Sequence, residues 1–184
     1  GIEGGILQMV NHGISTGGLF LVVGMIYERR HTRMIADFGG LSKVMPRLAA
    51  FFMIITLSSI ALPGTNGFVG EFLILLGVFR SNMLYGVLAA TGVILGAVYM
   101  LWMFQRVMFG QIKKEENKRL LDLTKREAAI LCAIVFFVFL MGLYPRAFLK
   151  KIDASAAGYL NDVQVKTAVY ASVGNVPVKQ SEAK

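Results

Sequence analysis

Long apolar stretches alternate with short charged segments along the chain. A bilayer core about 30 Å thick requires about 20 apolar helical residues, each rising about 1.5 Å. Four stretches meet this requirement, at about residues 6–27, 48–79, 83–108 and 128–143. The pattern predicts an all-α fold, a polytopic membrane helix bundle with four transmembrane spans.

The composition favours a membrane protein over a soluble domain. Of the 184 residues, 55% are apolar and 16% are charged, whereas soluble domains have roughly 45–50% apolar and about 25% charged residues. The net charge of +8 raises the possibility of nucleic-acid binding, but the basic residues flank apolar runs and no basic face with interleaved aromatic residues recurs. Cys132 is the single cysteine, so neither a disulfide framework nor a cysteine-based metal site is expected.

Basic residues between the spans predict the orientation of the chain. Residues 28–47 carry five Lys and Arg, and residues 106–126 carry seven, whereas the turn between the second and third spans carries only Arg80. Cytoplasmic loops are enriched in Lys and Arg, so we expect the first and third loops to lie together on the cytoplasmic side. The segment after the fourth span would then be periplasmic, although it carries six basic residues.

Both ends of the chain differ from the spans. Residues 1–148 are expected to form the transmembrane region, and residues 149–184 to form an interfacial to disordered tail in which apolar density falls. Within the C-terminal part, residues 147–163 fit an interfacial helix, and disorder is expected beyond them. The chain begins at Gly1 inside a helix-like pattern and without a signal peptide, so we expect that it lacks the N-terminal part of a longer protein.

A polar stripe interrupts the first span. Spacings of three and four residues put five polar side chains on one helical face, namely Gln8, Asn11, His12, Ser15 and Thr16. Such a face must contact other helices or water, because an ionisable group at membrane depth costs at least about 2.5–3.5 kcal/mol. Histidine exchanges protons near physiological pH, so His12 is a candidate proton carrier. A structural histidine within an interhelical hydrogen-bond network explains the stripe equally well.

The second span contains helix-breaking residues at its centre. Pro63, Gly64 and Gly67 predict a break, because proline removes a backbone donor and glycine permits non-helical dihedrals. Broken helices at membrane depth must be buried in protein or line water, and they recur in ion transporters. Glu71 would lie in the first turns of the second half-helix. The alternative is a hairpin outside the membrane with Glu71 on the surface, which is disfavoured because each half is too short to span alone.

His12 and Glu71 together predict proton transfer along a wet polar path, because a carboxyl and an imidazole in a low dielectric can be tuned toward physiological pH. Asn11, Ser15 and Thr16 would support this path from the stripe. Other polar residues near the break are candidates for its lining, although each is more often a residue that bonds the backbone, and they are Thr56, Ser58, Ser59, Thr65 and Asn66.

Other motifs are less specific. His31 lies in the basic first loop, where a surface role is favoured over a role at the cytoplasmic entry of the path. Gly92 and Gly96 form a small-residue pair that predicts helix packing. The sequence contains no nucleophile and base pair, phosphate loop or cofactor motif, so no catalytic chemistry is expected from the chain alone.

Three strings carry a family resemblance. They are QMVNHGISTGGLFLVVGMIY at residues 8–27, ERRHTR at 28–33 and LPGTNGFVGEFLIL at 62–75. In combination they resemble the antiporter-like chain M (chain 4) of the proton-pumping NADH-quinone oxidoreductase, respiratory complex I. The resemblance covers roughly residues 1–148, and no family motif is found beyond them.

The resemblance implies a role for each candidate residue. The chain would supply the last four transmembrane helices of the subunit, with residues 48–79 as a broken helix. His12 would be the histidine of the central hydrophilic axis and Glu71 the terminal acid of the proton path. Chain M has glutamate where related chains often have lysine, so Glu71 agrees with this chain in particular. The acid and lysines of the earlier helices lie outside this sequence.

The resemblance also implies partners and location. The chain would be a non-redox subunit of NADH-quinone oxidoreductase that moves protons when quinone is reduced elsewhere in the complex. It would bind no flavin, iron–sulfur cluster, quinone or metal, and it would contact other membrane-arm subunits and lipid in the inner membrane of a bacterium. Two alternatives remain, a subunit of a multisubunit cation/proton antiporter and a membrane anchor that transports nothing.

Overall fold

The computed structural model describes residues 1–174, whose regular elements are all helices, with no strand among them. Its elements are α1 (Ile2–Arg30), the short turns η1 (Ile35–Asp37) and η2 (Leu41–Lys43), α2 (Pro46–Ser59), α3 (Asn66–Ser81), α4 (Met83–Met108), α5 (Glu115–Lys118), α6 (Lys125–Leu143) and α7 (Arg146–Gly174). Helices α1, α4 and α6 are long and apolar enough to cross a membrane. The predicted membrane helix bundle is confirmed, with α2 and α3 as the two halves of the broken span.

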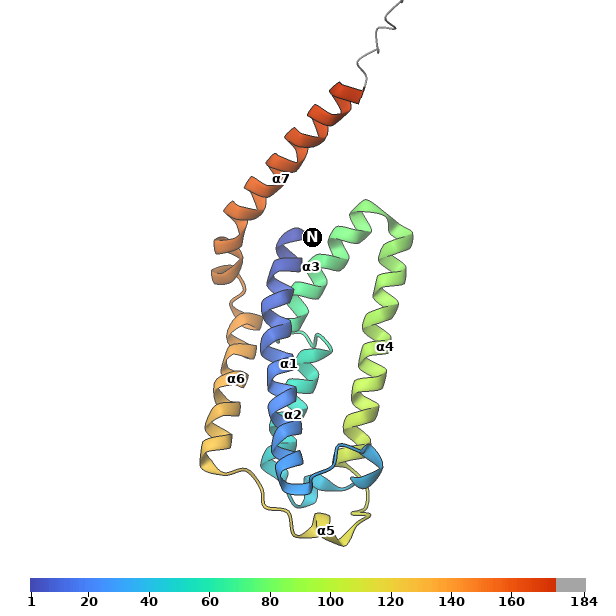
Figure 1. The fold of residues 1–184 in the computed structure, drawn as a ribbon, viewed down its shortest axis with the longest axis vertical. Coiled ribbons are helices and arrows are strands. Elements are labelled where there is room, and N and C mark those ends of the chain that lie inside the picture. The colour runs from blue at the N-terminus through green and yellow to red at the C-terminus, as the bar shows by residue number, and fades with distance from the viewer. Residues whose placement is uncertain (175–184) are drawn as a thin grey trace, which may run out of the picture.

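Helix α1 lies at the centre of the bundle (Figure 1), where it packs against α2, α3 and α6. Helix α4 stands to one side and contacts α3 and α2. The apolar core joins α1, α2, α4 and α6 near the end that carries α5, around Val22, Leu48, Phe52, Phe104 and Leu131. Many large apolar side chains of α4 are exposed in this chain. This is expected for a helix whose surface contacts lipid or further helices.

The predicted helix break lies between α2 and α3, and its second half is buried at Thr65, Asn66 and Gly67, whereas Leu62 and Pro63 are exposed in this chain. Helix α2 ends at Ser59 and α3 begins at Asn66. Gly64 has a φ of 91°, a conformation that favours glycine. A side-chain carbon at Gly67 would collide with the carbonyl oxygen of Ser58, and one at Gly142 of α6 would collide with the carbonyl oxygen of Gly64. Close backbone approach at these glycines therefore holds the broken segment between α2 and α6.

Charged contacts place both long polar loops at one end of the bundle, as the distribution of Lys and Arg predicts. The Arg29 Nε donates to the carbonyl oxygen of Leu121 at 2.9 Å. The Arg30 Nε donates to Asn117 Oδ1 at 2.6 Å, and the Asn117 amide donates to the carbonyl oxygen of Asp37 at 2.9 Å. The assignment of this end to the cytoplasm stays a prediction.

Helix α7 is longer than expected. The sequence predicts a helix over residues 147–163 and disorder beyond, whereas the helix extends to Gly174. No glycine or proline occurs between Tyr159 and Val173, so nothing in the local sequence ends the helix there. Ala156 is buried where α7 meets the start of α1, and α7 then projects beyond the bundle (Figure 1). The expected disorder of residues 175–184 lies outside the described residues.

Candidate functional site

Two asparagines join the polar stripe of α1 to the first residue of α3. The Asn11 Nδ2 donates to the carbonyl oxygen of Asn66 at 2.7 Å, and the Asn66 Nδ2 donates to the carbonyl oxygen of Asn11 at 3.2 Å. Asn11 is 1% exposed and Asn66 is fully buried. Buried polar groups require partners, and these two bonds give the amide nitrogen of each asparagine a partner on the other helix.

Two serines extend this contact to the end of α2. The Ser58 hydroxyl donates to Asn66 Oδ1 at 2.5 Å. The Ser15 and Ser58 oxygens are 2.7 Å apart, and the Ser15 hydroxyl also donates to Asn66 Oδ1 at 3.4 Å. The side chain of Asn66 therefore connects three helices at one point.

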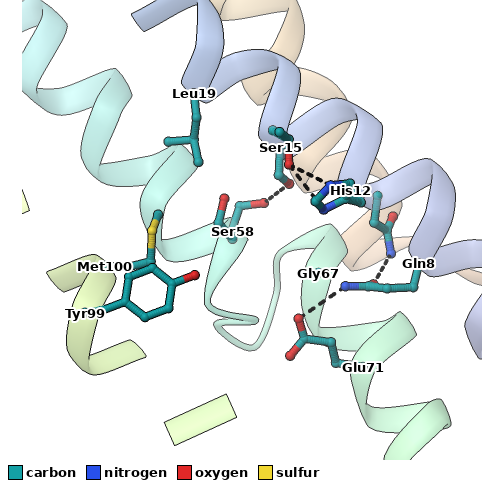
Figure 2. Close-up of a pocket in the computed structure, with 12 residues that line it drawn as sticks. Gln8, His12, Ser15, Leu19, Ser58, Gly67, Glu71, Tyr99 and Met100 are labelled. Carbon is teal, nitrogen blue, oxygen red and sulfur yellow. Dashed lines mark hydrogen bonds between the residues drawn. The ribbon is translucent and has the colours of Figure 1, made fainter. Parts of the chain in front are cut away.

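In the other direction the hydrogen bonds reach Glu71. The Asn11 Nδ2 donates to Gln8 Oε1 at 3.2 Å, and the Gln8 Nε2 donates to Glu71 Oε1 at 3.2 Å. Figure 2 shows Gln8 of α1 turned toward Glu71 on α3. A continuous series of hydrogen bonds thus runs from Ser58 to Glu71 through the stripe of α1.

Glu71 borders two cavities. The first has a volume of about 200 Å³ and is lined by Gln8, His12, Ser15 and Ser58, with Tyr99 and Met100 of α4 (Figure 2). The second has a volume of about 370 Å³ and is lined mostly by apolar and small residues of α3 and α4. Each cavity is large enough for several water molecules, and the first has the polar partners that ordered water requires.

His12 shares the first cavity with Glu71 but is not part of the hydrogen-bond series. Its ring is exposed in this chain, and its Nδ1 lies 3.2 Å from the Thr16 hydroxyl. Among the described residues no hydrogen bond joins His12 to Glu71 or to Gln8. The two residues therefore face each other only across the cavity they both line.

The other predicted residues divide into two groups. Asn11 and Ser15 are members of the series, Thr16 contacts His12, and Ser59 lines both cavities while its hydroxyl donates to the carbonyl oxygen of Ile55. The structure does not bring the remaining three to the first cavity. Thr65 donates to the carbonyl oxygen of Leu62 in its own turn, Thr56 is buried away from the cavity, and His31 ends α1 beside the ring of Tyr27.

The small-residue pair of α4 has no packing partner among the described helices, and its predicted role in helix packing stays a prediction. A side-chain carbon at Gly92 would have no neighbour within 4 Å, and one at Gly96 would meet only Tyr99 of the same helix. No helix of the described chain packs against them. Both glycines instead line the second cavity opposite Glu71, because the absence of side chains leaves space there.

Three members of the series were only weakly marked in the sequence. Gln8 belongs to the stripe, and Ser58 and Asn66 flank the Pro and Gly residues of the break. Their spacing indicates polar neighbours, but the identity of their partners depends on how α1 and α3 pack. The described residues contain no cluster of three His, Cys, Asp or Glu side chains able to hold a metal ion.

Fold and site together define a polytopic membrane protein whose broken helix places a carboxyl group beside a polar, cavity-lined path. Residues 1–96 match the family described as NADH:quinone oxidoreductase/Mrp antiporter, TM. The chain belongs to this family.

Individual relatives agree with the family. The chain is 45% identical over 177 residues to NADH-quinone oxidoreductase subunit M of Rhodobacter capsulatus, covering 95% of this chain and 35% of the relative. A chain of respiratory complex I from Thermus thermophilus with bound NADH is 37% identical with a TM-score of 0.72, over 78% of this chain and 30% of that one. A chain of the membrane-bound sulfane sulfur reductase, an archaeal respiratory membrane complex, is 26% identical with a TM-score of 0.73, over 78% of this chain and 24% of that one. The chain thus spans about a third of the length of the curated relatives it matches.

Proposed function

We propose that this chain is part of a proton-translocating membrane-arm subunit of NADH-quinone oxidoreductase and that Glu71 and His12 exchange protons in it. One observation carries the proposal. The Glu71 carboxyl lies just after the helix break, borders two cavities, and is joined by a hydrogen bond to the polar stripe that also bears His12. The similarity to subunit M of Rhodobacter capsulatus supports the same assignment.

The chemistry of the lining determines how protons move. Side-chain amides donate and accept hydrogen bonds but do not take up a proton, so Gln8, Asn11 and Asn66 cannot act as carriers. A carboxyl, an imidazole, hydroxyls and water can. A proton therefore moves between His12 and Glu71 through water in the first cavity.

Moving one charge against the membrane potential costs about 2.3 kcal/mol per 100 mV, so quinone reduction elsewhere in the complex must supply the energy.

The proposal includes the surroundings of the chain. It is a non-redox subunit that itself binds no flavin, iron–sulfur cluster, quinone or metal. A single cysteine in the sequence is too few for the four thiolates of a usual iron–sulfur cluster. Its partners are other membrane-arm subunits and lipid, with no nucleic acid. Its location is the energy-coupling inner membrane of a bacterium, which suits the exposed apolar surface of α4.

The test is Glu71→Gln in the full-length subunit, assembled in the complex and assayed in inverted membrane vesicles. We expect NADH oxidation and assembly to be retained and most NADH-driven proton pumping to be lost. Glu115→Gln is the matched control, because Glu115 is an exposed carboxyl at the far end of the bundle, paired with Lys118. Unchanged pumping in Glu71→Gln would instead favour a membrane anchor.

A cation/proton antiporter remains the second candidate, because the family description includes the Mrp antiporters. The two functions differ in their driving reaction. In the same vesicles, the proposed function requires proton movement that depends on NADH and is insensitive to sodium. Sodium-dependent proton movement without NADH would overturn the complex I assignment.

A further inference from the structure

Gln8 is the one described residue that donates a side-chain hydrogen bond to Glu71. The two residues are 63 positions apart and lie on different helices, so the bond depends on the packing of α1 against α3. Gln8 lines the first cavity, whereas Glu71 lines both cavities. The amide therefore contacts the carboxyl from the side that His12 shares.

The orientation of the Gln8 amide is determined by its neighbours. Asn11 Nδ2 donates both to Gln8 Oε1 and to the carbonyl oxygen of Asn66. Since Gln8 must accept from Asn11 through its oxygen, its nitrogen is directed at Glu71. The buried asparagine pair at the helix break thus fixes which end of the amide meets the carboxyl.

Gly70 provides the space in which Gln8 lies. A side-chain carbon at Gly70 would collide with Gln8 Oε1, and it would come within 3.0 Å of Gln8 Cβ and 3.1 Å of Asn11 Nδ2. The residue before Glu71 must therefore be glycine for the amide to reach the carboxyl. This close fit makes the contact sensitive to a single methyl group.

We propose that Gln8 is the positioning residue of Glu71, holding the ionised carboxylate toward the cavity lined by His12 and away from the second cavity. The inference rests on the proposed function. A hydrogen bond to an ionised carboxylate is stronger than one to the neutral acid, so uptake of a proton weakens the contact. The neutral acid is then free to turn toward the second cavity and release its proton there. The other titratable side chains that line these cavities are His12 and Tyr99.

Two variants test the positioning role by different means. Gln8→Met keeps the length of the side chain and removes the donor. Gly70→Ala keeps every polar atom and displaces the amide. Gly24→Ala is the control, because a side-chain carbon there meets nothing within 4 Å. Each variant is made in the full-length subunit and studied in the assembled complex, alongside Glu71→Gln.

The first measurement is the number of protons pumped per NADH oxidised, normalised to assembled complex. Loss of one hydrogen bond to a charged group corresponds to about a tenfold change in an equilibrium. We expect up to that fold loss of pumping in Gln8→Met and Gly70→Ala, with NADH oxidation retained when an uncoupler is present. Both changes break the same contact, so their effects should not add. The double variant should pump as many protons per NADH as the single variant that pumps fewer.

The second measurement is the antisymmetric carboxylate stretching band in redox-induced infrared difference spectra, which reports the ionised form of Glu71 that Gln8 contacts. The band that disappears in Glu71→Gln belongs to Glu71. We expect it to shift in Gln8→Met and Gly70→Ala, because the carboxylate loses a hydrogen-bond donor, and to stay in place in Gly24→Ala. A merely structural role of Gln8 would lower assembly without moving this band.

These outcomes distinguish failure of the positioning role from failure of the proposed function. If Glu71→Gln stops pumping while Gln8→Met and Gly70→Ala leave both the pumping ratio and the band unchanged, the positioning role is wrong and the proposed function stands. Additive losses in the double variant, or low assembly with a normal ratio per assembled complex, also contradict the positioning role. Normal pumping in Glu71→Gln contradicts the proposed function itself.

Discussion

Arg29 and Glu127 form a bidentate ion pair that joins the end of α1 to the start of α6. The two guanidinium nitrogens of Arg29 donate to the two carboxylate oxygens of Glu127, each at 2.8 Å. The Glu127 carboxylate also accepts from the backbone nitrogen of Thr124, while the Thr124 hydroxyl accepts from the backbone nitrogen of Glu127. This reciprocal capping box holds the first turn of α6 and presents the carboxylate to Arg29 in a fixed position.

Replacement of Arg29 should therefore lower the stability of the subunit. The pair is 15% and 12% exposed, so removing one partner leaves a mostly desolvated carboxylate, at a cost of about 2 kcal/mol. Arg29→Lys keeps the charge but not the fork of two parallel donors, and we expect about half that loss. The measurement is thermal denaturation of the detergent-solubilised complex, with the exposed Arg126→Ala as control. Equal stability of Arg29→Ala and Arg126→Ala would show that the pair contributes nothing.

Asp37 makes a second contact between the loops, and this one depends on pH. The hydrogen bond from Lys114, at 2.5 Å, lowers the pKa of Asp37 below its usual value, with a smaller contribution from the Thr32 hydroxyl. A lowered folded-state pKa means that the stabilisation is present above the usual pKa of about 3.9 and is lost as pH falls through the folded value. The melting temperature of Asp37→Asn should therefore equal that of the parent at the lowest pH and lie below it near neutrality. A constant difference at every pH would contradict this assignment.

The sequence predicts the spans well because the period and length of apolar runs depend only on local residues. It also predicts that both polar loops share one end, since each crossing reverses direction. It does not predict how the loop end is closed. Helix α2 begins after Met45, which offers no side-chain cap. Its first backbone nitrogens, those of Arg47 and Leu48, instead donate to Asp122 at 2.9 and 3.1 Å, a residue 75 positions away that no local pattern connects to them.

The same distinction applies to the candidate site. His12 and Glu71 stand out in the sequence because ionisable residues are rare in apolar spans. Gln8 and Asn66 are uncharged and look like ordinary polar residues of a stripe and a turn. Their importance comes from the packing of α1 on α3, which makes each the partner of a residue more than 50 positions distant. A single sequence contains the polar groups but not the pairs they form.

The close backbone contact at the helix break yields a steric prediction. Gly67→Ala would place a methyl group against the carbonyl oxygen of Ser58, so α3 would have to move away from the last turn of α2. Overpacking of this kind costs about 1–3 kcal/mol. We expect reduced assembly of the subunit, measured by native gel and by thermal denaturation. Gly17→Ala is the matched control, because its added carbon meets nothing within 4 Å in this chain. Comparable losses of assembly in both variants would contradict the steric explanation.

Asn66 should be the most sensitive uncharged residue of the site. Its side chain accepts from Ser58 and Ser15 and donates to the carbonyl oxygen of Asn11, all in a buried position. Asn66→Ala removes all three bonds, and although the Ser15 and Ser58 hydroxyls still have each other as partners, we expect a cost of about 1–3 kcal/mol; Ser58→Ala leaves the Asn66 pair with Asn11 intact.

We therefore expect Asn66→Ala to lower thermal stability more than Ser58→Ala does. Proton pumping per assembled complex should also fall in Asn66→Ala, because the first turn of α3 loses its side-chain contacts with α1 and α2, and the backbone carbonyl of that turn orients Asn11 and through it Gln8. If stability falls while pumping per assembled complex is unchanged, Asn66 serves the fold alone. The hydrogen bonds between the helix break and Glu71 would then have no part in proton transfer.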